Sequence, residues 1–280
     1  MLAFSAPAQN LFEADWGSGN IYEFTPGGAR STFASGFVDP AGLAVNSAGD
    51  LFVANFINGN IIEITPGGTQ STFASGFAGG PTGLAFNGAG DLFVANYGIN
   101  QIDEITPGGA QSLYAGGLDG PWALACDSAG DLFVGDRYSD YVYKYTPDGR
   151  RYFFAYGLGE PMGLAVNSAG DLFVASYLGT ITEINPAGVQ STFASGLSEP
   201  FGLACDSAGD LFVGDWGSGM IYKFTPGGTE STFASGLDGP TALAFQPVPE
   251  PSALGLLAVG VTAMLVCRRR RCATTRVRQH

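Results

Sequence analysis

The sequence predicts an all-β fold, a six-bladed β-propeller of four-stranded blades, from its composition and from an internal repeat. The 280 residues include 43 Gly and 16 Pro, which interrupt helices. A segment reading Leu-Phe, then Val or Glu, then Ala or Gly, then Asn, Asp or Ser occurs six times. The copies begin at Leu11, Leu51, Leu92, Leu132, Leu172 and Leu211. Their spacing of 39 to 41 residues fits one blade per copy.

One copy illustrates the four strands expected in each blade. Residues 42–45 form a short apolar strand, 46–50 a turn, and 51–55 a second strand. Residues 61–65 alternate between polar and apolar side chains as a third strand. After a Pro-Gly-Gly turn, residues 71–75 are rich in β-forming residues and predict the fourth strand.

The two ends of the repeat array predict how the ring closes. The first copy, residues 11–36, has the second, third and fourth strands but no clear first strand. Residues 241–245 repeat only the first strand. The C-terminal strand is therefore expected to complete the N-terminal blade, which removes exposed sheet edges. In the alternative, residues 2–4 form the first strand and residues 241–245 stay unpaired.

The charge distribution argues against nucleic acid as a partner. The net charge is -13, but six of the 12 basic residues lie in the last thirteen positions, where there is no acid. Residues 1–267 therefore hold six basic residues against 25 acidic ones, a charge of -19. Such a body repels a phosphate backbone, so we expect neither DNA nor RNA to bind.

Histidine and cysteine are too sparse for several kinds of active site. The single histidine is His280, the last residue, which excludes Ser-His-Asp and Cys-His nucleophiles and His-ligated metals from the propeller. Four cysteines do not make a disulfide framework, and Cys126 and Cys205 are expected to be small buried side chains. We expect no cofactor and no metal.

The blade pattern resembles that of NHL-type six-bladed propellers. The residues that carry this resemblance are Pro40–Val45, reading Pro-Ala-Gly-Leu-Ala-Val, and Gly49–Asn55, reading Gly-Asp-Leu-Phe-Val-Ala-Asn. The resemblance extends over residues 11–245. It implies a fold and not a function, because propellers carry many unrelated functions.

The C-terminus resembles a PEP-CTERM sorting signal. Its Pro-Glu-Pro motif is followed by an uncharged apolar run, residues 253–267, and then by four arginines. The signal residues are Pro249, Glu250, Pro251, Arg268, Arg269, Arg270 and Arg271. The resemblance implies that exosortase, a membrane-embedded enzyme of Gram-negative bacteria, recognises Pro-Glu-Pro, cleaves there, and releases or attaches the protein outside the cell.

Membrane physics predicts the same orientation. Residues 253–267 predict a short transmembrane helix, slightly below the roughly 20 residues that span a bilayer. The arginines stay in the cytoplasm, so the propeller lies across the inner membrane, in the periplasm or beyond. The alternative is an ordinary C-terminal anchor without a sorting enzyme. We divide the chain into a secretory-signal remnant (1–9), the propeller (10–246) and the sorting signal (247–280).

Binding is expected on the face where the loops between second and third strands meet the loops that enter the first strands. Each of the former begins with a small polar residue beside an aromatic one. These residues are Asp15, Trp16, Asn55, Phe56, Asn96, Tyr97, Asp136, Tyr138, Ser176, Tyr177, Asp215 and Trp216. Aromatic faces stack on sugars while polar groups bind hydroxyls, so we expect an extracellular polysaccharide or a surface protein as partner.

Ring closure is expected to bring Asp15 and Trp16 beside Asp215 and Trp216, which makes this the preferred patch of the face. The loops that enter the first strands add acidic residues: Asp39, Asp119, Glu160, Glu199 and Asp238. On the plainer interpretation these side chains only form hydrogen bonds with the loop backbone. On the corresponding plainer interpretation of the aromatics, each is a wedge between blades, copied by duplication.

The alternative function is a hydrolase or lyase. Propeller lactonases related to gluconolactonase bind a divalent metal through Asn or Asp placed before Gly-Leu, and Glu160 or Glu199 could imitate their glutamate. The positions before Gly-Leu or Ala-Leu here are Ala41, Thr82, Trp122, Met162 and Phe201, none of which matches. Streptogramin lyases need a histidine that the propeller lacks. A non-catalytic binding or scaffold protein is therefore favoured over an enzyme, including a carboxylate hydrolase at Asp15 and Asp215 with Glu13 nearby.

Overall fold

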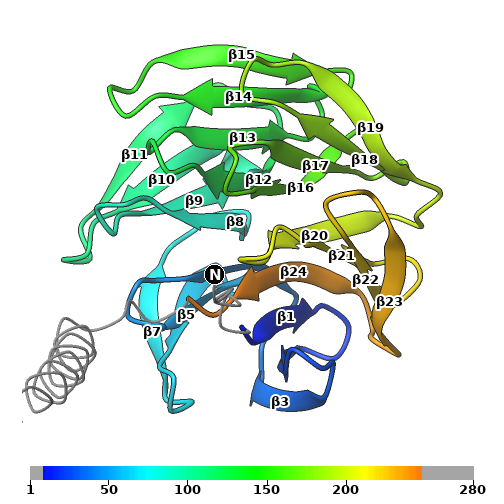
Figure 1. The fold of residues 1–280 in the computed structure, drawn as a ribbon. Coiled ribbons are helices and arrows are strands. Elements are labelled where there is room, and N and C mark those ends of the chain that lie inside the picture. The colour runs from blue at the N-terminus through cyan, green and yellow to red at the C-terminus, as the bar shows by residue number, and fades with distance from the viewer. Residues whose placement is uncertain (1–8, 248–280) are drawn as a thin grey trace, which may run out of the picture. The chain divides into compact units, whose positions relative to one another are not determined.

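The computed structural model describes residues 9–247, which form an all-β six-bladed propeller (Figure 1). Each blade is a four-stranded antiparallel sheet, and its strands follow one another from the ring centre outward. Blade 1 is β24 (Pro240–Phe245), β1 (Leu11–Asp15), β2 (Asn20–Phe24) and β3 (Arg30–Ser35). Blade 2 is β4 (Pro40–Val45), β5 (Leu51–Asn55), β6 (Asn60–Ile64) and β7 (Gln70–Ser75). Blade 3 is β8 (Pro81–Phe86), β9 (Leu92–Asn96), β10 (Gln101–Ile105) and β11 (Gln111–Gly116).

The remaining three blades have the same order. Blade 4 is β12 (Pro121–Cys126), β13 (Leu132–Asp136), β14 (Tyr141–Tyr145) and β15 (Arg151–Tyr156). Blade 5 is β16 (Pro161–Val166), β17 (Leu172–Ser176), β18 (Thr180–Ile184) and β19 (Gln190–Ser195). Blade 6 is β20 (Pro200–Cys205), β21 (Leu211–Asp215), β22 (Met220–Phe224) and β23 (Glu230–Ser235). A single 3₁₀ turn, Tyr97–Ile99, completes the secondary structure of residues 9–247.

The predicted closure is confirmed, because β24 pairs antiparallel with β1. Leu11 lies opposite Phe245 and Glu13 opposite Leu243. The C-terminal strand thus occupies the innermost position of blade 1, and the alternative in which residues 241–245 stay unpaired is wrong.

Several predictions fall on residues that the structure does not describe. The signal remnant through residue 8, the Pro-Glu-Pro motif, the apolar run and the arginines all lie outside residues 9–247. Within 9–247 there is no helix with the length and apolar character needed to span a bilayer.

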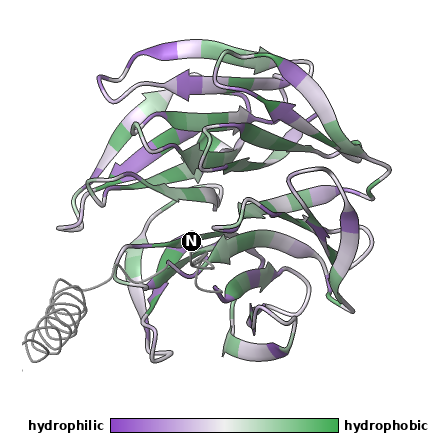
Figure 2. Ribbon diagram, in the orientation of Figure 1, coloured by the Kyte–Doolittle hydropathy of each residue, from purple (hydrophilic) through white to green (hydrophobic). Residues whose placement is uncertain are grey.

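The residue pattern of each blade follows from how its strands are covered. In β5 every residue of Leu-Phe-Val-Ala-Asn is buried, because the neighbouring blades cover both faces of the second strand. In β7 the Gln70, Ser71, Thr72 and Ser75 side chains are exposed. Figure 2 shows the result, with hydrophobic residues on the strands near the ring centre and hydrophilic residues on the outer strands and turns.

The core is divided among the interfaces between adjacent blades, and aromatic side chains pack edge to face within them. The Phe52 ring meets those of Phe73 and Phe86 at centroid distances of 4.9 Å. Phe212 meets Phe233 and Phe245 at 5.0 and 5.1 Å, in the interface that contains the closing strand. Edge-to-face pairs of this kind add about 1 kcal/mol each beyond burial of their area.

The innermost strands approach each other at backbone distance. A Cβ atom on Gly42 would overlap the carbonyl oxygen of Thr82 in the next blade, and one on Gly163 would overlap that of Phe201. Only glycine fits such an approach. The centre of the propeller ring is consequently narrow, which limits the space for a ligand in the central channel.

Candidate functional site

The loops between second and third strands and the loops that enter the first strands share one face and are joined by backbone hydrogen bonds. The Phe56 N–H donates to the Asp39 carbonyl (3.2 Å), that of Tyr177 to Glu160 (3.0 Å), and that of Trp216 to Glu199 (3.0 Å). A similar bond joins the Tyr138 N–H to the Asp119 carbonyl (3.0 Å). Each of these four bonds places an aromatic residue next to an acidic one.

The small polar residues of the candidate face are buried and brace these loops. Asp15 is 1% exposed, and its Oδ2 accepts the Asp238 N–H at 2.8 Å while its Oδ1 accepts from Ser18. Asp215, also 1% exposed, accepts from the Ser198 N–H and the Ser218 hydroxyl through Oδ2. Their counterparts Asn55, Asn96, Asp136 and Ser176 are buried as well. Asn55, Asp136 and Ser176 brace the loops in the same way, whereas the Asn96 amide donates to Asp103 on β10.

Burial also sets the electrostatics of these carboxyl groups. Desolvation raises the pKa of Asp215, while hydrogen bonds from the Ser198 N–H and the Ser218 hydroxyl act in the opposite direction. Desolvation likewise raises the pKa of Asp136, against hydrogen bonds from Asp119 and Ser139. The carboxyl groups of Asp15 and Asp215 are each committed to their own loop braces and do not form a pair across a cleft.

The aromatic residues, by contrast, form a connected surface. The ring centroids of Trp16 and Phe56 lie 5.7 Å apart, those of Phe56 and Tyr97 6.2 Å, and those of Tyr97 and Tyr138 6.2 Å. The chain of rings includes two residues that the sequence pattern did not place there, Trp122 and Phe201. We call the whole set the aromatic surface: Trp16, Phe56, Tyr97, Trp122, Tyr138, Tyr177, Phe201 and Trp216. Within this set Trp122 and Phe201 are buried and connect the more exposed rings.

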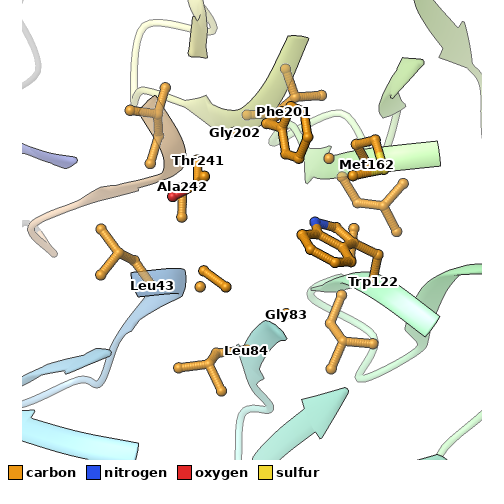
Figure 3. Close-up of a pocket in the computed structure, with 17 residues that line it drawn as sticks. Leu43, Gly83, Leu84, Trp122, Met162, Phe201, Gly202, Thr241 and Ala242 are labelled. Carbon is orange, nitrogen blue, oxygen red and sulfur yellow. The ribbon is translucent and has the colours of Figure 1, made fainter. Parts of the chain in front are cut away.

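The mouth of the central channel is filled by large side chains from three neighbouring blades. Trp122, Met162 and Phe201 stand at the second position of their innermost strands and project into the ring centre (Figure 3). The cavity left there is about 60 Å³ and is lined by the innermost strands of all six blades. It has room for a few water molecules and for no sugar-sized ligand. A ligand of that size therefore does not fit inside the channel.

Several of the aromatic rings also pack against the following blade. The Phe56 ring lies on Gly80 and the Trp216 indole on Gly239, so closely that a Cβ atom at either glycine would overlap the ring. The plainer interpretation of these residues as wedges therefore describes part of their role. Two of the rings are nevertheless accessible to a ligand, since Trp216 is 40% and Tyr138 54% exposed.

Arg137 is a member of this face to which the sequence pattern assigned no role. Its guanidinium carbon lies 5.7 Å from the Trp122 ring, 5.2 Å from Tyr138 and 5.6 Å from Tyr177. Its Nε donates to Glu160 Oε2 at 2.9 Å. The sequence signal is a departure from the repeat, because Arg137 stands where the other five copies have an aromatic residue.

Three of the acids beside the aromatic surface adopt a backbone conformation that other blades give to glycine. The residue before the first strand has φ of 53° at Asp39, 59° at Glu160 and 63° at Glu199. Blades 1, 3 and 4 place Gly239, Gly80 and Gly120 there. Left-handed backbone is uncommon for non-glycine residues. The backbone of these loops is thus tightly constrained at Asp39, Glu160 and Glu199.

Neither a metal centre nor a reactive thiol is apparent in residues 9–247. No group of three or more His, Cys, Asp or Glu side chains in this range could hold an ion. Cys126 and Cys205 are half-buried free thiols, and burial raises the pKa of each to about 12. Protonated thiols at neutral pH are poor nucleophiles.

A model of the PEP-CTERM protein-sorting motif matches residues 247–271. The predicted sorting signal is thereby confirmed. It indicates that the protein is exported and is processed by an exosortase at the membrane.

The fold is similar to several solved propellers. A chain of the nidogen/laminin complex is 19% identical, with a TM-score of 0.78 over 86% of this chain and 99% of that one. A gluconolactonase from Xanthomonas campestris is 18% identical (TM-score 0.69, 86% and 91% covered). Virginiamycin B lyase from Staphylococcus aureus is 19% identical (TM-score 0.61, 72% and 73% covered). At these identities the likeness shows the fold alone, and none of the curated proteins matches this chain significantly.

Proposed function

We propose that this protein is a non-catalytic module that binds polysaccharide outside the cell through the aromatic surface. The observation that carries the proposal is the chain of aromatic rings on one face, with neighbouring centroids 5.3 to 6.3 Å apart. Aromatic rings present apolar faces to the C–H groups of sugars, and the carboxylates and backbone groups of the loops can bind hydroxyls. A surface of several rings suits a chain of sugars better than one small molecule.

The sorting motif supports an extracellular role. A polysaccharide produced outside the membrane meets the propeller only after export, and the motif at 247–271 supplies that route. We propose a Gram-negative source, with the mature protein at the cell surface or in the extracellular matrix, where binding would make it a scaffold.

A lactonase-like hydrolase is the competing function, because two of the similar solved structures carry gluconolactonase in their names. Three observations weigh against it. Trp122, Met162 and Phe201 fill the channel mouth, the cavity is about 60 Å³, and the carboxyl groups of Asp15 and Asp215 are engaged in loop braces.

The test is retention of the purified propeller on a panel of neutral, anionic and cationic polysaccharides, with calcium and with chelator. Residues 9–247 lie within one compact unit and are used for it. The Trp16→Ala, Trp216→Ala variant is expected to weaken retention about tenfold or more, since each stacked ring contributes roughly 1 kcal/mol. Chelator is expected to have no effect.

The control is Phe153→Thr with Tyr156→Ser. Both aromatics are 72% exposed on β15, the outer strand of blade 4, where four other blades have Thr and Ser. Retention that the control variant weakens as much as the tryptophan variant would mean non-specific stacking. Hydrolysis of a lactone that chelator abolishes would instead establish the hydrolase.

A further inference from the structure

The aromatic surface already binds one cation, the side chain of Arg137. Three rings surround the guanidinium at 5.2 to 5.7 Å and a carboxylate contacts it at 2.9 Å. Cations are attracted to the faces of aromatic rings, most strongly to Trp and Tyr. Arg137 therefore shows, within the chain itself, which charge this surface stabilises.

Charge around the aromatic surface has the same sign everywhere except at Arg137, the one basic residue that residues 9–247 place in the loops of this face. The entering loops of five blades carry an acidic side chain: Asp39, Asp119, Glu160, Glu199 and Asp238. Glu160 is paired with Arg137, and Glu199 accepts the Tyr177 hydroxyl at 3.1 Å. The carboxylates of Asp39, Asp119 and Asp238 have no hydrogen bond or ion pair within the described part of the chain, and each residue is at least partly exposed.

These free carboxylates belong to loops that contact partly exposed aromatic residues. Asp39 is joined through its backbone to Phe56, whose ring meets Trp16. The carboxylate of Asp238 lies against Gly17, beside Trp16, while the adjoining Gly239 lies against the Trp216 indole. On this side of the propeller, aromatic side chains and carboxylates occur together as they do around Arg137. No basic side chain from residues 9–247 pairs with these carboxylates.

We propose that the ligand of the aromatic surface is cationic, a polysaccharide with free amino groups. This inference rests on the proposed function and specifies its ligand class. The ammonium groups would contact Asp39, Asp238 and the faces of Trp16 and Trp216, while the sugar rings stack along the accessible tyrosines Tyr97, Tyr138 and Tyr177. An acidic face raises the local concentration of a cationic polymer and repels an anionic one.

A basic peptide is the other cationic polymer to consider, and the shape of the face favours the sugar. A lysine or arginine side chain is bound best in a pocket that surrounds it, as Arg137 is bound. The channel mouth, however, is filled, and the rings next to Asp39 and Asp238 are partly exposed to solvent, Trp216 by 40%. Flat stacking suits pyranose rings.

The experiment compares binding of chitosan and chitin oligosaccharides of equal length, which share a backbone and differ in whether the amino group is free or acetylated. Chitosan is expected to bind the propeller at least tenfold more tightly at low salt, with the difference shrinking as salt is added. Alginate is expected not to bind. Asp39→Asn with Asp238→Asn is expected to weaken chitosan binding at least fivefold and to leave chitin binding within twofold.

The matched control is Asp148→Asn with Glu230→Gln, which removes the same two charges from exposed positions outside this face. It is expected to change chitosan binding less than twofold. Binding of chitin or alginate as tight as that of chitosan would overturn this inference and leave the proposed function standing. Binding of no glycan at all would overturn both. Binding of poly-lysine without chitosan would replace the sugar with a basic peptide.

Discussion

Lys223 on β22 forms an ion pair with Asp210, with Nζ and Oδ2 2.7 Å apart. Lys144 pairs with Asp131 in the same way in blade 4. In some other blades the two equivalent residues are both acidic and repel each other. In blade 5 the equivalent residues are Glu183 and Asp171, and both desolvation and the Asp171 charge raise the pKa of Glu183. The same backbone position thus carries an ion pair of Lys and Asp in blades 4 and 6 and a repulsive pair of Glu and Asp in blade 5.

Glu183→Lys is therefore expected to stabilise the propeller. The change replaces a repulsive carboxyl pair by the ion pair seen in blades 4 and 6, and exposed pairs of this kind contribute about 0.5 kcal/mol. Urea unfolding at pH 7 measures the change in unfolding free energy. The reverse change, Lys223→Glu, should lower it by a similar amount. Equal effects of both variants in the same direction would contradict this account.

Glu13→Val is expected to stabilise the protein more. Glu13 is fully buried, and neither carboxyl oxygen has a hydrogen-bond partner in residues 9–247. The other five blades have valine at this position. Removing an unsatisfied buried polar group should raise the unfolding free energy by roughly 1–2 kcal/mol, measured by urea unfolding at pH 7. A less stable variant would mean that Glu13 has a partner that the structure does not show.

The same residue predicts a pH dependence. Burial, and secondarily the charge of Asp15, raise the pKa of Glu13 well above 4.5, although Arg30 acts in the other direction. The folded state therefore keeps a proton that the unfolded state releases, so this contribution to stability is complete below about pH 4.5 and is lost as the pH rises towards the folded pKa.

The pH effect is isolated by comparing wild type with Glu13→Val at several pH values between 4.5 and 7. Buried carboxyls that do not interact with Glu13 titrate alike in both proteins and cancel in the difference. The stabilisation by valine should grow with pH, by at most about 1.4 kcal/mol per pH unit. A difference that stays constant over this range would exclude a raised pKa at Glu13.

Gly163→Ala tests the close approach of the innermost strands. The added methyl group would overlap the Phe201 carbonyl oxygen, so the variant should lose at least about 3 kcal/mol of unfolding free energy or fail to fold. Gly27→Ala is the control, because no atom beyond its chain neighbours lies within 4 Å of a Cβ there. A change of more than about 0.5 kcal/mol in the control would show that glycine is needed for reasons other than space.

Most of the fold was predictable because each strand is specified locally and the pattern is repeated. Residues 51–55 were predicted as they are observed, and closure by residues 241–245 followed from what the first copy lacks. The innermost strand of blade 2 was predicted from Gly42 but begins at Pro40. Proline is typical of turns, which placed the predicted start of the strand too late, but proline is also accepted as the first residue of a strand.

The placement of the candidate residues in the loops was predictable, but the burial and contacts of each side chain were not. The repeat located the aromatic residues, whereas the burial of Asp15 depends on a bond to Asp238, 223 positions away. Trp122, Phe201 and Arg137 were missed as members of the surface because repeat analysis emphasises what the copies share. These three residues differ from their counterparts in most other blades, and a site shared by six blades is shaped by such differences.

The most direct test of the aromatic surface uses the tryptophans themselves. The chain has three, Trp16, Trp122 and Trp216, and all three belong to this surface. Intrinsic tryptophan fluorescence of the propeller, titrated with the polysaccharide that retains it, should change saturably, at the concentrations that give half-maximal retention. Ligand should also protect the 40% exposed Trp216 from acrylamide quenching. A polysaccharide that retains the propeller while leaving both the emission and its quenching unchanged would contradict binding at this face.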